Sequence, residues 1–351
     1  MDYETVVTNM HLLPEFGSSI REFQKDDIRV DYRVHMALSG YTNLTMVKSL
    51  GIFMLSFADI IGYHAPDIIL LAGDRGEQLV AALVGAHMNI PVAHIQAGEV
   101  SGNIDGMTRH AIARYAHIHF ASNEDASLRL IKMGEEKFRI FLVGAPQLDE
   151  FNLRNITNKR GIQEKFSIDL HKPLILVVQH PVTEQSAFAE QQMTATMKAI
   201  AGIGHQTIVL YPNNDAGSMA IQNCILQNRH INIRMERNLS REDFAGLLNV
   251  SSVIVGNSSS GIIEAPSFKL PAVNIGRRQD GRLQAKNVIN VPDHNSVEIE
   301  AAIRKALTKE YKNYLHDIRN PYGDGRSSER IIKILESIPI DEKLLFKRIS
   351  Y

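Results

Sequence analysis

Short apolar runs alternate with stretches of helical spacing along most of the chain. In the first half, the predicted strands are residues 66–73, 91–95, 118–121 and 141–144. Residues 77–88 and 108–115, which lie between these strands, have the spacing of helices. Near-continuous apolar strands separated by helices are typical of a parallel sheet that is covered on both faces.

A polar stretch at residues 152–160 interrupts this alternation, which then restarts. The predicted strands of the second half are residues 173–178, 206–211, 231–235, 252–256 and 272–275. The predicted helices are residues 189–201, 218–228, 241–249, 261–268, 296–307 and 327–338. The pattern therefore predicts an α/β fold with two Rossmann-like, doubly wound domains and a cleft between them.

The polar interruption sets the predicted domain boundaries. We expect a first domain at 1–155, a linker at 156–171, a second domain at 172–325, and a C-terminal helix and tail at 326–351. In doubly wound sheets, ligands bind outside the carboxyl ends of the strands. The residues that directly follow each predicted strand are therefore the candidates for chemistry.

Charge and composition narrow the class of protein. The 38 basic and 39 acidic side chains give a net charge of −1 among 351 residues, which argues against an extended nucleic-acid track. Cys224 is the only cysteine, so no internal disulfide is possible. No apolar run of about 20 residues and no signal-peptide pattern is evident. We expect a cytoplasmic protein without nucleic-acid or membrane partners.

A serine-rich turn follows the predicted strand 252–256. Asn257, Ser258, Ser259, Ser260 and Gly261 lead from this strand into a predicted helix. Free backbone N–H groups, hydroxyl donors and the positive end of the helix dipole would meet here, as in phosphate sites. The alternative is plain N-capping, for which one serine would suffice. Three serines between two glycines favour phosphate binding.

Two further features of the second domain fit a nucleotide. Glu264 lies about one turn into the same helix, where its carboxylate could bind both hydroxyls of a ribose, or merely interact with the helix dipole. Arg277 and Arg278 follow the strand 272–275. Guanidinium groups beside a phosphate site favour a diphosphate, and the alternative is a solvated surface pair.

Titratable residues also follow strands elsewhere. Asp74 and Arg75 come after Gly73 at the end of the strand 66–73, either facing the cleft or forming a salt bridge with each other. His180 follows the strand 173–178, and the alternative to a cleft residue is an ordinary core histidine.

The segment 94–110 is dense in titratable groups: it contains Glu99, Asp105, Arg109 and two histidines, one of them His110. Asp105 could simply cap the following helix. Two acids in one cleft loop could instead have pKa values that are pushed apart, and so divide acid and base roles.

Metal and cofactor motifs are absent from the sequence. His117 and His119 lie two residues apart, but no third ligand is evident and there is no paired-cysteine motif. Neither a Gly-Lys-Ser/Thr phosphate loop nor a Gly-x-Gly-x-x-Gly motif occurs. We expect no metal and no cofactor.

Taken in order, these motifs resemble one known family, the hydrolysing UDP-N-acetylglucosamine 2-epimerases of sialic-acid-type sugar synthesis. The matching segments are residues 10–17, 73–75, 98–105, 109–110, 179–183, 212–218, 256–259 and 322–325, so the resemblance covers nearly the whole chain. Non-hydrolysing relatives carry Gly-Leu-Arg after the loop glutamate. This chain has Val-Ser-Gly-Asn-Ile-Asp after Glu99, which is the hydrolysing type.

The resemblance implies a GT-B-like fold in which the first domain faces the sugar and the second binds UDP. It implies anti elimination of UDP from a UDP-2-acetamido sugar, UDP-N-acetylglucosamine or a 2,4-diacetamido relative. Hydration of the glycal would then release a free 2-epimeric sugar such as N-acetylmannosamine. We also expect a homo-oligomer, a dimer or tetramer. The alternatives are a GT-B glycosyltransferase, against which the sugar-side carboxylates argue, and an inactive UDP-sugar-binding form.

The resemblance also implies roles for single residues. Asp74, Glu99 and Asp105 would be the catalytic carboxylates, with Asp105 as the base at C2, and His180 would lie near the diphosphate. Ser258, Ser259 and Gly261 would hold phosphate, Glu264 the ribose, and Arg278 the nucleotide side. The other predicted binding residues are Arg75, Arg109, His110, Asn213 and Asn257.

The chain departs from the family pattern in two places. Ala97 stands where the family usually has glycine. The family begins with a strand, a Thr-Gly-Thr-Arg type loop and a helix before the part that matches Met10 onward, and these elements have no counterpart in this sequence. Because the first strand of a doubly wound sheet is central, we expect a gap in the first-domain sheet and an unstable first domain.

Overall fold

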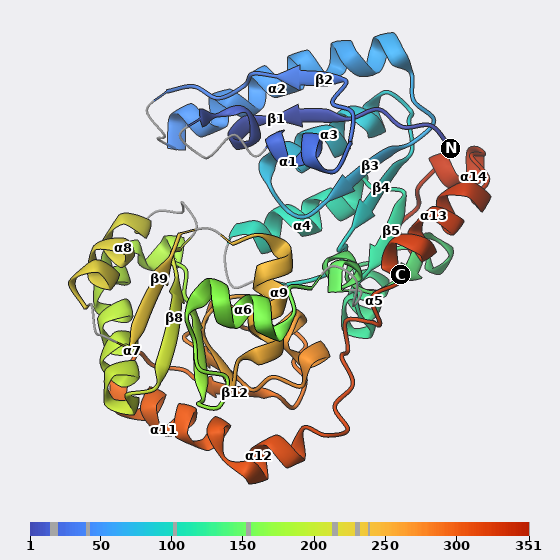
Figure 1. The fold of residues 1–351 in the computed structure, drawn as a ribbon. Helices are drawn as coiled ribbons and strands as arrows, with labels where there is room; N and C mark the ends of the chain where they lie inside the picture. Colours follow the sequence, from blue (N-terminus) through green and yellow to red (C-terminus); the bar gives the residue numbers. More distant parts are fainter. Residues whose placement is uncertain are drawn as a thin grey trace.

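The computed structural model describes residues 1–14, 20–39, 43–100, 104–151, 156–212, 217–228, 232–237 and 239–350. Figure 1 shows two α/β domains, with the first domain in blue to green above the second in green to orange. The C-terminal segment, in red, returns to the first domain. The predicted α/β fold with parallel sheets is confirmed.

The second domain has a complete parallel sheet of six strands in the order β12-β11-β10-β7-β8-β9. Its strands are β7 (Leu174–Val178), β8 (Gln206–Leu210), β9 (Ile233–Glu236), β10 (Val253–Gly256), β11 (Ala272–Ile275) and β12 (Val288–Val291). All five residues of β7 are buried, and β7 pairs with β8 on one side and with β10 on the other. This is the strand order of a doubly wound dinucleotide-binding sheet.

Helices cover both faces of this sheet because its strands are apolar on both sides. The helices α7 (Ala189–Ile203), α8 (Ser218–Gln227) and α11 (Ser296–Leu307) share one core with the sheet. The opposite core contains α6 (Lys159–Phe166), α9 (Arg241–Val250) and the 3-10 helix η6 (Ala265–Phe268). Between β10 and η6 lies the short helix α10 (Ser260–Ile263). Residues 156–171, which the polar composition predicts to be a linker, include α6, whose Ile162 and Phe166 are buried in the second-domain core.

The first domain has two separate sheets. One contains four parallel strands: β3 (Ile69–Ala72), β4 (Val92–Ile95), β5 (Ile118–Ala121) and β6 (Ile140–Leu142). The other pairs β1 (Val6–Thr8) with β2 (Tyr32–Val34), also in parallel. Within the described residues, no strand joins the two sheets. The gap that we expect from the sequence is present in the structure.

One core nevertheless holds both first-domain sheets together. The principal helices here are α2 (Asn43–His64), α3 (Gly76–His87), α4 (Ile104–Tyr115) and α5 (Glu124–Lys132), and a short helix α1 (Ile20–Lys25) lies between β1 and β2 in sequence. Phe53, Phe57 and Ile61 of α2 pack in one cluster with Val34 of β2 and Leu71 of β3.

The expectation that no apolar run reaches the length of a membrane span is wrong, because helix α2 is long and apolar enough to cross a membrane by length and composition. Its segment Leu44–His64 has a mean hydropathy of 1.7, and 22% of that window is buried. Figure 1 shows α2 along the outer side of the first domain.

The C-terminal segment ties the two domains together. After α12 (Lys309–Tyr314), the helices α13 (Ser327–Ser337) and α14 (Glu342–Leu345) cover the β4–β6 part of the first-domain sheet. Arg139 is fully buried there and donates to the carbonyl oxygens of Lys343 (2.8 Å), Leu344 (2.5 Å) and Phe346 (3.2 Å). Lys347 donates to Ala116 O (2.8 Å), which fixes the end of the chain against the end of α4.

Candidate active site

A buried ionic cluster lies at the carboxyl end of the first-domain sheet. Asp74 follows Gly73, whose φ of +91° turns the chain sharply after β3. Arg109 of α4 forms an ion pair with Asp74 and a second one with Glu99, where Nη1 is 3.8 Å from Oε2. Glu99 and Arg109 are each 3% exposed. We call Asp74, Glu99 and Arg109 the carboxylate cluster; its formal charge is −1.

The carboxylate cluster retains unused hydrogen-bonding capacity. Glu99 Oε1 and the Nε and Nη1 atoms of Arg109 are buried without a hydrogen-bond partner among the described residues. Buried polar atoms without partners are unfavourable by roughly 1–3 kcal/mol each, so they are rare outside functional sites. A polar substrate that reaches the cluster can supply the missing partners.

His94 contacts the backbone directly before the carboxylate cluster. The residue is fully buried in β4, and its Nε2 lies 2.7 Å from Gly73 O. Burial lowers the pKa of His94 to about 3, so the ring is neutral at neutral pH and Nε2–H donates to the carbonyl. This hydrogen bond fixes the backbone directly before Asp74.

Helix α4 brings the second half of the predicted loop toward the same end. Asp105 is the second residue of α4, but its side chain lies outside the described part of the chain, so its role as the C2 base stays a prediction. His110 follows Arg109 on this helix and is partly buried. Burial, and then the charges of Arg129 and Arg109, lower the pKa of His110.

On the second-domain side, Ser258–Gly261 form a tight turn, which we call the serine turn. Ser258 Oγ donates to Ser260 Oγ (3.1 Å) and accepts from the N–H of Ser260 (3.3 Å). Ser259 occupies the N-cap position of α10 but makes no side-chain cap hydrogen bond. Ser259 therefore does not cap the helix, but Ser258 accepts a backbone N–H of the turn, so plain capping by one serine remains the alternative to phosphate binding.

The helix after the serine turn is shorter than the sequence pattern predicts. The predicted helix 261–268 consists of the four-residue α10 and then η6. Pro266, at the start of η6, lacks the N–H that would continue an α-helical ladder. Gly261 is buried against β11, where a Cβ atom would lie 3.3 Å from that of Ala272, and its N–H donates to Ser258 O (3.2 Å).

Asn257 connects the predicted residues of three loops. Its side chain accepts from the N–H of His180 (2.7 Å) and donates to the carbonyl of His180 (2.8 Å). Its own carbonyl oxygen accepts from Arg278 Nη1 (3.2 Å) and Gln279 Nε2 (2.8 Å). The structure thus gathers His180, Asn257 and Arg278 at the carboxyl end of the second sheet.

Glu264 is buried beside the serine turn. Its side chain is 8% exposed, Arg241 Nη2 is 4.0 Å from Oε1, and Oε2 has no hydrogen-bond partner within the described chain. Burial raises the pKa of Glu264, and the charge of Arg241 only partly opposes this effect. A buried carboxyl group with an unused oxygen is suited to accept hydrogen bonds from ligand hydroxyls.

A hydrogen bond joins the two domains beside Glu99. Arg282, in the loop after β11, donates from Nε to the carbonyl of Val100 (3.1 Å), directly after Glu99. Tyr322 is buried nearby and donates to Leu283 O (2.9 Å). Burial, and then the charge of Glu99, raise the pKa of the Tyr322 hydroxyl.

Two of the predicted residues are not part of this arrangement, and two residues that are part of it were not predicted from the sequence. Arg75 is exposed and stands at the N-cap of α3 instead of pairing with Asp74. Asn213 lies outside the described residues. Gln279, which is 2% exposed, and Arg282 were not predicted, although both follow the double arginine after β11.

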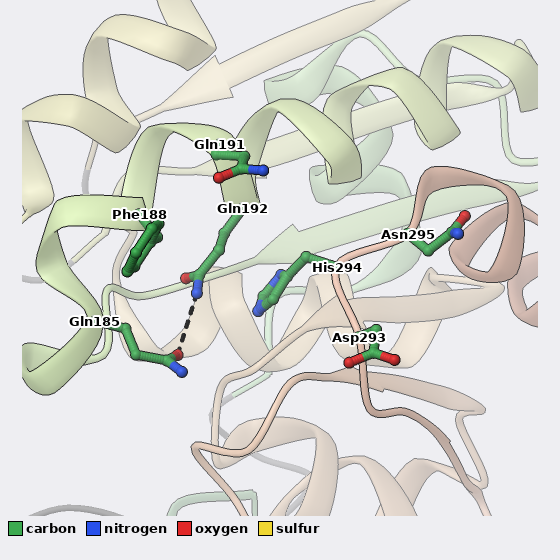
Figure 2. A pocket seen from close by; sticks show the side chains of 7 residues that line it. All are labelled: Gln185, Phe188, Gln191, Gln192, Asp293, His294 and Asn295. Atoms are coloured by element: carbon green, nitrogen blue, oxygen red, sulfur yellow. Dashed lines mark hydrogen bonds between the residues drawn. The ribbon is translucent and has the colours of Figure 1, made fainter.

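A separate cavity lies elsewhere in the second domain. It has a volume of about 370 Å³ and is lined by Gln185, Phe188, Gln191, Gln192, Asp293, His294 and Asn295. Figure 2 shows these side chains, with Gln192 donating to Gln185 (3.1 Å). None of the predicted site residues lines this cavity. In the described ranges, no group of three potential metal ligands occurs either.

Two Rossmann-like domains, with a carboxylate cluster in the first and a polar turn beside a buried glutamate in the second, place the chain in the GT-B-like fold class. Comparison with known proteins identifies the family within this fold class. Residues 1–336 match the family model described as UDP-N-acetylglucosamine 2-epimerase, so the chain belongs to this family.

Two named relatives are similar over nearly the whole chain. The UDP-N,N'-diacetylbacillosamine 2-epimerase (hydrolyzing) of Legionella pneumophila is 37% identical over 352 residues, which cover 100% of this chain and 92% of the relative. The UDP-N-acetylglucosamine 2-epimerase of Neisseria meningitidis is 30% identical, over 96% of this chain and 88% of the relative. The predicted family and enzyme class, a hydrolysing 2-epimerase, are confirmed.

A solved structure supports the fold. The crystal structure of UDP-GlcNAc 2-epimerase from Neisseria meningitidis bound to UDP-GlcNAc superposes with a TM-score of 0.81, at 19% identity, over 95% of this chain and 92% of that one.

Proposed function

We propose that this chain hydrolyses and epimerises a UDP-2,4-diacetamido sugar, releasing UDP and the free 2-epimeric sugar, with UDP-N-acetylglucosamine as the second candidate substrate. One observation supports this reaction above all: Arg109 pairs with both Asp74 and Glu99 and so holds their carboxylates together at the carboxyl end of the first-domain sheet. The 2,4-diacetamido substrate is favoured because relatives at 37% and 30% identity are named for diacetylbacillosamine.

The order of steps follows from acidity. The proton at C2 of the sugar is far too weakly acidic for a carboxylate to remove first. Cleavage of the bond between C1 and the UDP oxygen gives an oxocarbenium-like ring, and this makes the C2 proton acidic enough for transfer to a carboxylate. In the second half-reaction, water adds its oxygen to C1 of the glycal and a proton is returned to C2 on the opposite face.

Each half of the site has a part in these steps. We assign proton removal at C2 to Asp105, and glycal hydration to Asp74 and Glu99. The serine turn and Arg278 hold the departing diphosphate, as hydroxyl, backbone and guanidinium donors do at other phosphate sites. His180 orients the turn through its hydrogen bonds with Asn257. Glu264 accepts hydrogen bonds from the ribose hydroxyls.

The substrate assignment is tested by incubating the purified chain separately with UDP-N,N'-diacetylbacillosamine and UDP-N-acetylglucosamine and identifying the free sugar. We expect kcat/KM to be higher for the diacetamido substrate. The opposite preference would make the chain an N-acetylmannosamine-forming enzyme of sialic acid synthesis. Tight UDP binding without any free sugar would make it a binding protein.

We also infer a cytoplasmic homo-oligomer. The single cysteine, Cys224, is buried and unpaired, which fits a reducing compartment. On α2, the apolar side chains Leu44, Val47 and Leu55 are exposed, and a second copy of the chain is the occupant that we assign to this face. Light scattering should give a dimer or tetramer, and Leu55→Glu should shift it toward monomer. A monomeric wild type would contradict this inference.

A further inference from the structure

The C-terminal end of α4 is held by a residue that is distant in sequence. Residues 342–350, which we call the C-terminal strap, place the ammonium group of Lys347 at this helix end. Its Nζ donates to the carbonyl oxygens of Ala113 (2.5 Å), Arg114 (3.1 Å) and Ala116 (2.8 Å). The last carbonyl groups of a helix have no partner within the helix, and a cation there also interacts favourably with the helix dipole. Lys347 therefore caps α4.

Glu135 binds this ammonium group from a second side. Its side chain is fully buried, and Oε2 lies 2.7 Å from Lys347 Nζ and 3.0 Å from Nε2 of His119 on β5. Oε1 pairs with Arg114 Nη1 of α4 (3.2 Å). Burial alone would raise the pKa of Glu135, but the hydrogen bond with His119 and the charge of Lys347 outweigh burial and lower it. Burial lowers the pKa of Lys347 to about 8, against the charge of Glu135, so both groups are charged at neutral pH. The carboxylate thus joins α4, β5 and the C-terminal strap at one point.

The C-terminal strap fits closely against the first domain on both sides of Lys347. Before it, Arg139 donates to three carbonyl groups of the strap. After it, Ser350 donates its N–H to Gly134 O (2.8 Å). Gly134 has a φ of +86°, and a Cβ atom there would lie 2.8 Å from Ile349 Cγ2 and 2.8 Å from Ser350 O. Only glycine permits this close approach, so the position of Lys347 is fixed by the contacts of the strap around it.

The same helix carries Arg109 of the carboxylate cluster. Nη2 of Arg109 donates to Asp74, whereas Nε and Nη1 have no hydrogen-bond partner within the described chain. Because so few hydrogen bonds hold the guanidinium group, its place depends on the backbone of α4. Arg109 and Ala116 are seven positions apart, which is about 10 Å of helix. A shift or rotation at the capped end of α4 would therefore move the guanidinium group relative to its two carboxylates.

We propose that Lys347 is a positioning residue: its ammonium group fixes the C-terminal end of α4 and thereby the place of Arg109 in the carboxylate cluster. Lys347 acts through the helix, since its hydrogen bonds in the described chain go to the end of α4 and to Glu135. Asp105, the proposed base, is the second residue of the same helix. The expected effect on turnover rests on the proposed function, whereas the effect on α4 does not.

Removal of the ammonium group tests the effect on turnover, with a control in the same strap. Lys347→Met keeps the aliphatic stem and removes the charge and the donors. With UDP-N,N'-diacetylbacillosamine, kcat should fall by about ten- to a hundredfold, because a misplacement of about 1 Å can have an effect of that size. UDP affinity by calorimetry should not change, because the second domain is untouched. Lys343→Met, at an exposed lysine of the strap whose Nζ lies over the ring of Phe138, should change neither quantity. A wild-type kcat in Lys347→Met, or equal losses in the two variants, would overturn the proposal.

Hydrogen exchange follows the end of α4 independently of activity. The amide of Ala116 donates to Ile112 O (2.8 Å) in the last turn of the helix. Without the cap this turn should open more often, so the amide of Ala116 should exchange about tenfold or more faster in Lys347→Met than in the wild type. The amide of Ser251, which donates to Leu247 O (2.9 Å) at the end of α9, is the control and should not change. Unchanged exchange at Ala116 would contradict the proposal.

The exchange measurement also separates this proposal from the proposed function. If the end of α4 exchanges faster in Lys347→Met but the wild type releases no free sugar, the proposed function fails and the role of Lys347 in holding α4 stands. If the wild type hydrolyses the substrate and Lys347→Met equals it in kcat and in exchange, the role of Lys347 fails and the proposed function stands.

Chemical restoration of the ammonium group distinguishes positioning from a general loss of folding. Lys347→Cys can be alkylated with bromoethylamine, which gives a side chain of the length of lysine that ends in an ammonium group; the native cysteine, Cys224, is buried. This modification, confirmed by mass spectrometry, should recover most of the kcat and slow the exchange of Ala116. Alkylation with iodoacetamide gives a side chain of similar length that ends in a neutral amide, and it should recover neither. Equal recovery with the two reagents, or no recovery with bromoethylamine, would contradict the proposal.

Discussion

The two sides of the candidate site are built from different chemistry. On the first-domain side, Asp74, Glu99 and Arg109 form a buried ionic cluster in which hydrogen-bonding atoms are left over. On the second-domain side, hydroxyl and amide groups of Ser258 and Asn257 form a turn that is mostly bonded to itself and to its neighbours. The difference fits the proposed function, in which the first domain performs the proton transfers and the second holds the nucleotide.

Substitution of the proposed C2 base should give the largest difference between the effect on turnover and the effect on UDP binding. Asp105→Asn keeps the shape of the side chain and removes the base, so kcat should fall by about 10²–10⁴ while UDP affinity stays near the wild-type value. Stopped assays of UDP release and calorimetry with UDP measure the two quantities. Asp59→Asn, on the exposed part of α2, is the matched control and should change neither. A wild-type rate in Asp105→Asn would leave this residue as a helix cap.

Loss of the arginine should damage the first domain itself. Arg109→Met leaves two carboxylates near each other without their cation, and breaking a buried ion pair in this way destabilises proteins by about 3–5 kcal/mol. Thermal or urea unfolding, with separate probes for each domain, should show the loss in the first domain only. Unchanged stability would mean that the cluster is solvated and that its geometry is not set by Arg109.

Substitutions on the second-domain side should weaken UDP binding without changing the rate of the chemical steps. Ser259→Ala should weaken UDP binding by about 1–2 kcal/mol, the contribution of a hydrogen bond to a charged group. Saturating substrate should restore a wild-type kcat. Ser337→Ala, on α13, is the matched control because its hydroxyl bonds only within its own helix. If UDP affinity by calorimetry is the same in Ser259→Ala and wild type, the serine turn has a structural role alone.

Acid should weaken the first domain before the second. Burial lowers the pKa of His94 to about 3 and that of His117 to about 4, and both residues lie in the first domain. The unfolded chain takes up protons below about pH 6.5, whereas the folded protein does not until far lower pH. Stability is therefore retained above pH 6.5 and lost as the pH falls from 6.5 toward 4, by about 2 kcal/mol for His94 at pH 5.

Melting curves at pH 7.5, 6.5 and 5.0 measure this effect, and His94→Gln should flatten the pH dependence. Unfolding of both domains at the same pH would contradict the predicted difference in their acid stability.

The strands and their carboxyl-end residues could be predicted because the sequence carries local signals for them. The predicted strand 118–121 is β5 without a change of boundary, and the run 173–178 contains β7. Helix α2 could not be predicted in the same way, because apolar side chains surround it and blur the helical period. Which side chains of α2 are buried and which are exposed depends on the place of the helix in the fold, and a local sequence pattern contains no information about that place.

That Asp74 and Glu99 lie near each other could be predicted from the sequence, but their pairing partner could not. Both residues follow strands, and the carboxyl ends of parallel strands meet at one edge of the sheet. Nothing in the local sequence indicates that Asp74 pairs with Arg109, 35 positions away, instead of with its neighbour Arg75. Similarly, the bond from Arg282 to Val100 spans 182 positions and depends on how the domains close over each other.

The most direct test of the central claim is the reaction itself, run in D₂O with UDP-N,N'-diacetylbacillosamine and followed by NMR. The account predicts equal amounts of free UDP and free 2-epimeric sugar, with one deuterium at C2, because the C2 proton is lost to the enzyme and replaced from solvent. A sugar that remains linked to UDP, or a free sugar that keeps its original configuration and its C2 proton, would contradict elimination and hydration as the function of this site.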